Sequence, residues 1–139
     1  MGLITHLLDT SAVLAHYFQV PGAQVVHSLL LEHPGRLGLS VVSVPELAWR
    51  LAAHLGDPRE SERALKVYIE ELTQSVALTR EMADASVRLQ RATASSLPLV
   101  RALIAGTAQA RNAMLVYCDP RFDAIPDALV KKLRLPSTE

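Results

Sequence analysis

Apolar and polar residues follow two alternating patterns along the chain. Short runs of apolar and β-branched residues, which are typical of buried strands, are separated by longer stretches whose apolar residues recur at the spacing of one helix face. The runs that predict strands are 3–8, 37–42, 75–78, 114–117 and 130–135. The stretches that predict helices are 11–18, 23–32, 43–55, 58–70, 80–93 and 98–111. Strands that alternate with helices favour a single α/β domain over residues 1–139, a three-layer sandwich whose central parallel sheet has four to five strands.

Turn residues support several of these boundaries. Gly56 follows the third predicted helix, and Asn112 follows the last one. Both residue types readily adopt the left-handed conformation that ends a helix. Ser95 and Ser96 are candidate caps ahead of Pro98, which suits a first helical turn.

Composition excludes several classes of protein. A length of 139 residues suits one domain, and the lone cysteine, Cys118, excludes a disulfide scaffold and suits the reducing cytoplasm. Residues 10–31 carry no charge, but Pro21 and Gly22 divide them, so we expect no membrane span. The N-terminus has no basic region and its first apolar stretch is interrupted by His6 and Asp9, so we expect no secretory signal.

Charge is neutral in sum but unevenly distributed. The chain has 14 acidic and 14 basic residues, which excludes a polycation that binds nucleic acid along its whole surface. Residues 57–84 contain seven acids against four basic residues, whereas residues 85–121 contain five arginines and one acid. A basic surface beside an acidic one is therefore expected.

Three carboxylates follow predicted strands. Asp9 comes after the first strand, Glu46 just after the second and Asp119 just after the fourth. In open α/β sheets, ligands bind beyond the carboxyl ends of the strands. Three carboxylates gathered there form a hard oxygen site that prefers Mg²⁺ or Mn²⁺, the ions of many nucleases.

Each of these acids also has a purely structural interpretation. Ser43 and Glu46 have the spacing of a capping box, and Asp9 precedes a predicted helix. Asp119 is followed by a proline, which is typical of a turn. Spacing alone leaves both interpretations open.

Four segments resemble the motifs of the PIN domain family. They are LLDTSAVL at 7–14, SVPEL at 43–47, LVRALIAGTA at 99–108 and LVYCDPRF at 115–122. Together they span residues 3–125 in the family's order, which is nearly the whole chain. The resemblance implies a metal-dependent endoribonuclease, most similar to the toxin half of a VapBC-type toxin–antitoxin pair.

The resemblance also implies roles for individual residues. Asp9, Glu46 and Asp119 would hold Mg²⁺ or Mn²⁺ with the attacking water, and Ser11 would support the site through its hydroxyl. Such toxins act on RNA in the cytoplasm, form homodimers and bind a small antitoxin protein across the active-site groove. The candidates for contacts with RNA phosphates are Arg88, Arg91, Arg111 and Arg121.

The third motif departs from the family at Arg101, where the family has an aspartate ahead of the ALIA run. An arginine in a first helical turn is also unfavourable to the helix dipole. Pointing outward, Arg101 would be a surface residue. Pointing inward, it would pair with Asp9 or Asp119 and take the place of the metal, because one charge pair about 4 Å apart is worth roughly 4 kcal/mol at a dielectric constant near 20. We therefore predict weak or absent nuclease activity.

Two other functions compete with a working nuclease. A catalytically silent PIN-type module that binds RNA, a protein partner or a second copy of itself is compatible with Arg101. A two-component receiver or a haloacid-type phosphatase also uses aspartates at strand ends. That class is disfavoured, because the fourth-strand region has no lysine and Asp9 has no second aspartate two residues later.

Overall fold

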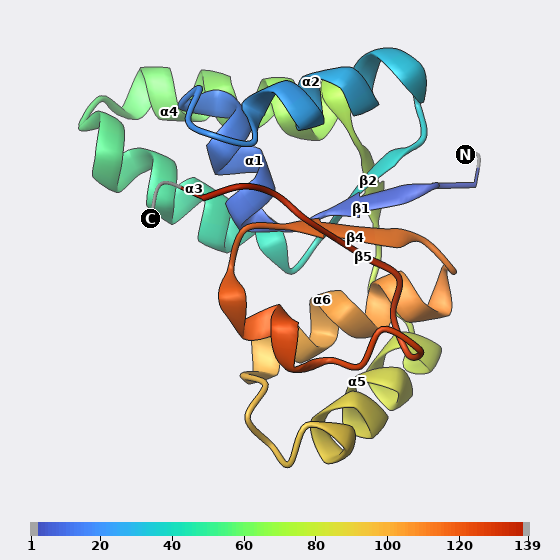
Figure 1. The fold of residues 1–139 in the computed structure, drawn as a ribbon. Coiled ribbons are helices and arrows are strands. Elements are labelled where there is room, and N and C mark those ends of the chain that lie inside the picture. The colour runs from blue at the N-terminus through green and yellow to red at the C-terminus, as the bar shows by residue number, and fades with distance from the viewer. Residues whose placement is uncertain (1–2, 138–139) are drawn as a thin grey trace.

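Within residues 3–137, which the computed structural model describes, the chain forms a five-stranded sheet of order β3-β2-β1-β4-β5 (Figure 1). Neighbouring strands run parallel throughout. The strands are β1 (His6–Leu8), β2 (Leu37–Ser40), β3 (Gln74–Val76), β4 (Met114–Tyr117) and β5 (Lys132–Arg134). The predicted parallel sheet is confirmed, and its first strand is shorter than the apolar run at 3–8 suggested.

Helices cover both faces of the sheet. Figure 1 shows α1 to α4 on one face and α5 and α6 on the other. Their bounds are α1 (Thr10–Tyr17), α2 (Ala23–Glu32), α3 (Ser43–Leu55), α4 (Pro58–Lys66), α5 (Arg80–Ala92) and α6 (Leu99–Ala110). The predicted three-layer α/β sandwich is therefore confirmed. None of the helices in residues 3–137 has the length and apolar character that a membrane span requires.

Successive side chains of each strand point to opposite faces of the sheet, and each face has its own hydrophobic core. Leu7 of β1 and Leu115 of β4 pack with α5 and α6, whereas Leu8 and Val116 pack with the helices of the opposite face. All four side chains are buried. Because successive strand residues point to opposite faces, a sheet covered on both sides needs continuous apolar runs, which is the pattern that identified these strands.

The main difference from the predicted elements lies after α4. The helix predicted over 58–70 is α-helical up to Lys66 and continues as a π-helical segment, η1 (Val67–Leu72). A further short element, the 3-10 helix η2 (Pro120–Ala124), follows β4 where the sequence suggested a turn.

Turn residues behave partly as expected. Gly56 and Asn112 have φ angles of 68° and 52°, so both adopt the predicted left-handed conformation. The serines ahead of α6 do not cap it, because the N-cap position is Pro98 and no side chain caps this helix. Ser95 instead has a φ of 62° in the connecting loop.

A glycine sets the distance between α5 and α6. A Cβ on Gly106 would lie 2.4 Å from Ser86 Oγ and 2.6 Å from the carbonyl oxygen of Met82. A glycine at this position therefore permits the close packing of the two helices (Figure 1). This packing fixes α6, whose first turn carries Arg101.

Candidate functional site

The three candidate carboxylates lie at the carboxyl edge of the sheet. Asp9 directly follows β1, Glu46 lies in the first turn of α3 after β2, and Asp119 lies two residues after β4. Since β1 is the strand between β2 and β4, the three segments end side by side. Arg101, the third residue of α6, completes the group.

Arg101 points into this acidic cluster and bridges two of its members. Its Nη1 and Nη2 atoms donate to Glu46 Oε1 at 3.0 Å and to Glu46 Oε2 at 2.8 Å. Its Nε donates to Asp119 Oδ2 at 2.9 Å. The residue is only 6% exposed. The guanidinium thus forms a bidentate pair with Glu46 and a second ion pair with Asp119, an arrangement for which its planar fork of donors is suited.

Asp119 has a second arginine partner. The backbone N–H and Nε of Arg121 each donate to Asp119 Oδ1 at 3.0 Å. Arg121 Nη2 donates to Asp119 Oδ2 at 2.7 Å. Asp119 therefore caps η2 and forms ion pairs at the same time, and both of its carboxylate oxygens are occupied by arginine donors.

Ser11 connects the ends of β1 and β4. Its Oγ donates to Asp9 Oδ1 at 2.7 Å and accepts from the backbone N–H groups of Cys118 at 2.9 Å and Asp119 at 3.1 Å. Asp9 Oδ1 also accepts from the backbone N–H of Ala12 at 3.1 Å, so Asp9 caps α1 while facing the site. One hydroxyl thereby fixes two of the three carboxylate positions.

The second oxygen of Asp9 has no partner. Asp9 is fully buried, and within residues 3–137 its Oδ2 makes no hydrogen bond. Burial raises the pKa of Asp9 to about 6, although the hydrogen bonds from Ser11 and Ala12 oppose that rise. The carboxyl group therefore titrates near neutral pH, because burial penalises its charged form.

The other two carboxyls are held in the charged form. The hydrogen bonds from Arg101 lower the pKa of Glu46. Burial alone would raise the pKa of Asp119, but the hydrogen bonds from Arg121 and Arg101 outweigh it and hold that pKa well below its usual range. Two carboxylates and two guanidinium groups thus form a nearly neutral cluster.

This arrangement does not fit a divalent ion. Both oxygens of Glu46 and both oxygens of Asp119 already accept hydrogen bonds from arginines. Among the described residues, no group of three or more histidine, cysteine, aspartate or glutamate side chains is arranged to hold a metal ion. A cation at this edge would also face the fixed charge of Arg101.

The capping-box interpretation of Glu46 is wrong. The N-cap position of α3 is Val42, and no side chain caps the helix. Ser43 Oγ is buried without a hydrogen-bond partner in the described residues. The Glu46 carboxylate faces Arg101 and does not reach back to the helix start. For Asp9 and Asp119, by contrast, the structural interpretation is confirmed, because Asp9 caps α1 and Asp119 caps η2.

The arginines considered for RNA contacts are dispersed. Arg88 on α5 contacts Gln109 Oε1 at 3.5 Å, and Arg91 lies in the last turn of the same helix. Arg111 is the C-cap of α6, about 15 Å along the helix axis from Arg101. Of the four candidates, Arg121 contacts the acidic cluster. The sequence analysis did not predict that Arg121 pairs with Asp119. The signal was present, because an aspartate whose side chain accepts from the backbone N–H two residues later forms an Asx turn.

Comparison with protein families identifies the fold. The family model of the PIN domain matches residues 6–128, and the chain belongs to the PIN domain family. PIN domains are generally nucleases that use divalent metal ions. No curated protein is similar enough in sequence to count as a relative.

Solved structures of toxin–antitoxin proteins share the fold. VapBC2 from Rickettsia felis, bound to a promoter DNA fragment, is 16% identical with a TM-score of 0.76 and covers 96% of this chain and 100% of its own. VapBC from Salmonella typhimurium bound to DNA is 15% identical with a TM-score of 0.75 and covers 94% and 98%. Mycobacterium tuberculosis VapC20, a toxin that cleaves the sarcin–ricin loop, is 15% identical with a TM-score of 0.69 and covers 95% and 100%.

Proposed function

We propose that this chain is the toxin-type component of a VapBC-like toxin–antitoxin pair, and that Arg101 closes its endoribonuclease site. Membership of the PIN family and the fold shared with VapBC toxins support the first part. The single observation that carries the second part is the bridge from Arg101 to Glu46 and Asp119. On this proposal, hydrolysis of RNA by the chain as it stands is weak or absent.

The inactivity follows from charge and from chemistry. Mg²⁺ or Mn²⁺ held by Asp9, Glu46 and Asp119 would supply an activated water in a working nuclease of this family. A guanidinium cannot replace that function, because it carries only donors and does not release a proton near neutral pH. The bonds to Glu46 raise the pKa of Arg101 further above its already high value.

The remaining surfaces support a binding role. We propose that the chain engages a small antitoxin-type protein, associates with a second copy of itself and retains contacts with RNA. Complexes such as that of VapBC2 from Rickettsia felis support a protein partner. The exposed arginines of α5 and the C-cap residue Arg111 are the candidates for RNA phosphates. The second candidate function is therefore a catalytically silent PIN module in the cytoplasm. The ion pairs of Arg101 with Glu46 and Asp119 favour it.

An RNA cleavage assay tests the proposal. The wild-type chain and Arg101→Asp are compared with Mg²⁺ or Mn²⁺, and Arg36→Asp serves as the matched charge change at the opposite edge of the sheet. We expect Arg101→Asp to cleave RNA at least about tenfold faster than the wild-type chain and Arg36→Asp. A tenfold difference corresponds to a change of about 1.4 kcal/mol in the free energy of metal binding.

The other outcomes are equally informative. Strong cleavage by the wild-type chain would show that Arg101 does not close the site. If Arg101→Asp binds Mn²⁺ yet leaves RNA intact, the ribonuclease assignment is wrong.

A further inference from the structure

Two histidines from different helices lie beside one cavity outside the acidic cluster. His16 is in the last turn of α1, at the end opposite Asp9, and His27 is in α2. Their rings are nearly parallel, with an interplanar angle of 13° and centroids 6.2 Å apart. The chain turns at Pro21 and Gly22 between the two helices, which pack against each other. Folding therefore brings together two imidazoles that form no local motif in the sequence.

A buried tyrosine orients the first of these rings. His16 Nδ1 and Tyr68 Oη are hydrogen-bonded at 2.6 Å, and the two rings meet edge to face. Tyr68 belongs to η1 and is 4% exposed. The bond occupies one nitrogen of the imidazole and leaves Nε2 for another ligand. A histidine that binds a metal almost always makes such a bond with its other ring nitrogen, because the bond fixes the direction of the coordinating one.

Imidazole and amide groups line the cavity. Its volume is about 460 Å³, and its lining residues are His16, Gln19, Ala23, Gln24 and His27. No lysine or arginine is among the residues that the described part of the chain contributes to this lining. Gln19 has a φ of 54°, which is uncommon for a residue with a side chain, and its Nε2 donates to the His16 carbonyl oxygen at 2.6 Å. That bond leaves the amide oxygen of Gln19 as a further acceptor at the cavity.

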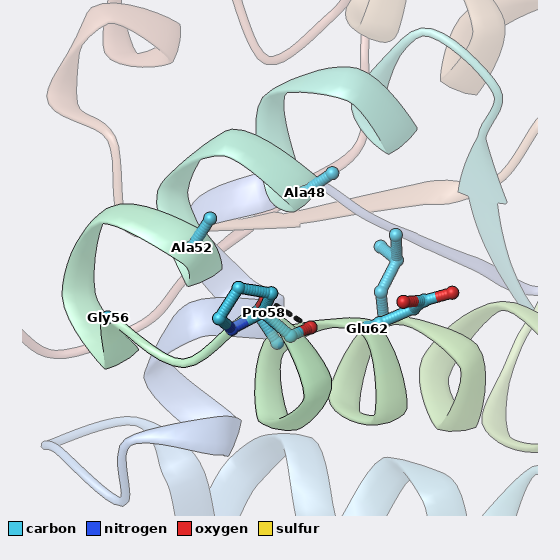
Figure 2. Close-up of a pocket in the computed structure, with 7 residues that line it drawn as sticks. Ala48, Ala52, Gly56, Pro58 and Glu62 are labelled. Carbon is cyan, nitrogen blue, oxygen red and sulfur yellow. Dashed lines mark hydrogen bonds between the residues drawn. The ribbon is translucent and has the colours of Figure 1, made fainter.

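The cleft between α3 and α4 has a different chemistry. Figure 2 shows Ala48 and Ala52 on α3, with Pro58 and Glu62 on α4. Of the residues that line this cleft in the described chain, Glu62 is the one with an ionisable side chain. A lone carboxylate between apolar walls does not form a metal site, whereas two neighbouring imidazoles provide two strong ligands for one ion.

The two imidazoles suit a transition-metal ion. Burial lowers the pKa of His16, and the neighbouring His27 lowers it further, so His16 is neutral near pH 7 and keeps a lone pair for a ligand bond. Imidazole nitrogen suits Zn²⁺, Ni²⁺ and Cu²⁺, whereas Mg²⁺ prefers oxygen. Zn²⁺ binds imidazole nitrogen at about 2.0–2.1 Å, so two histidines share an ion when their nitrogens are about 4 Å apart or less. Rings whose centroids are 6.2 Å apart reach that separation when their nitrogens face each other.

We propose that His16 and His27 bind one divalent ion of the Zn²⁺ type, with Gln19 Oε1 and water completing its coordination. A structural zinc site has four protein ligands. Two imidazoles and one amide oxygen leave a position to water, so this site is open to solvent. The bound ion ties α1 to α2 and stabilises the folded chain, because it binds the folded state alone. Neither Arg101 nor RNA takes part in this site.

Calorimetric titration of the wild-type chain with Zn²⁺ tests the proposal. We expect saturable binding of one ion per chain, and Mg²⁺ should not compete for it. His27→Ala removes one ligand at an exposed position. Tyr68→Phe keeps the ring but removes the hydroxyl that orients His16. Tyr68→Phe should raise the Zn²⁺ dissociation constant about tenfold or more, and loss of a ligand in His27→Ala should raise it at least as much.

His33→Ala is the matched control, because His33 belongs to a second histidine pair, with its ring centroid 4.8 Å from that of His6. It should bind Zn²⁺ like the wild-type chain. The ring-nitrogen NMR signals of His16 and His27 should shift when Zn²⁺ is added, whereas those of His33 should not. A wild-type chain without saturable binding, or a His27→Ala variant that binds Zn²⁺ as tightly as the wild-type chain, overturns the proposal. Loss of binding in His33→Ala would assign the ion to the other pair and overturn it as well.

Discussion

Arg101 and Glu46 lie 55 positions apart in the sequence, yet two parallel hydrogen bonds join their side chains. Glu46 belongs to α3 and Arg101 to α6, helices that cover opposite faces of the sheet (Figure 1). The ion pair therefore crosses the carboxyl edge of the sheet and connects the two outer layers. One side chain thus bonds two carboxylates of the acidic cluster and links α3 to α6.

Removal of the Arg101 charge should destabilise the protein. Arg101→Met leaves Glu46 without its cation and Asp119 with Arg121 as its remaining partner, and breaking a buried pair costs about 3 kcal/mol or more. The side chains of Glu46 and Asp119 are 28% and 11% exposed, so solvent screens the loss only partly. Urea denaturation at neutral pH measures this change in the free energy of unfolding.

Arg63→Met is the comparison for that experiment. Arg63 pairs with Glu60 on the surface, where the side chains are 72% and 47% exposed. Its loss should change the free energy of unfolding by less than about 1 kcal/mol. Equal effects of the two substitutions would show that the Arg101 pairs contribute nothing beyond a surface contact.

Ser11→Ala should destabilise the connection between β1 and β4. The Ser11 hydroxyl accepts from two backbone N–H groups and donates to Asp9. Its removal leaves those partly buried donors unpaired, at a cost of about 2–3 kcal/mol. Ser61→Ala, which removes a single bond to the Pro58 carbonyl, should cost about 1 kcal/mol or less in the same denaturation assay. A larger loss of stability for Ser61→Ala than for Ser11→Ala would contradict this role of Ser11.

The burial of Asp9 should make the free energy of unfolding depend on pH. Burial raises the pKa of Asp9 in the folded state to about 6, from an ordinary value of 3.8. Between these values the folded state retains a proton that the unfolded state has lost, so the Asp9 contribution to stability falls as pH rises from about 4 to 6. The loss approaches about 3 kcal/mol near pH 7.

Asp9→Asn isolates this contribution, because the amide does not titrate. The variant should gain stability relative to the wild-type chain as pH rises from about 4 to 7. Any fixed cost of burying the amide shifts the whole curve and leaves this slope unchanged. A constant difference across the range would show that burial does not raise the Asp9 pKa.

Sequence patterns predicted most of the fold because both faces of the sheet are buried. Continuous apolar runs identified β2 and β4, and glycine and asparagine identified the ends of α3 and α6. The π-helical segment η1 was missed, because its residues continue the apolar spacing of α4 while the hydrogen-bond pattern changes.

The site was predicted less completely. The positions of Asp9, Glu46 and Asp119 followed from the strand ends, since parallel topology brings those ends together. Of the two partners expected for an inward-pointing Arg101, Asp119 is confirmed, whereas Asp9 forms no ion pair with it in the described residues. The pair with Glu46 did not follow, because local spacing is silent about contacts between α3 and α6. The distance from Ser43 to Glu46 even suggested a capping box, which long-range pairing with Arg101 overrides.

Calorimetric titration with Mn²⁺ most directly tests whether Arg101 stands in place of the metal. The wild-type chain and Arg101→Asp are titrated under identical conditions, with Arg101→Asp/Asp119→Asn as the control for binding at this site. We expect saturable binding by Arg101→Asp and at least about tenfold weaker binding by the wild-type chain and by the control. Equally tight Mn²⁺ binding by the wild-type chain and Arg101→Asp would contradict the closure of the site by Arg101.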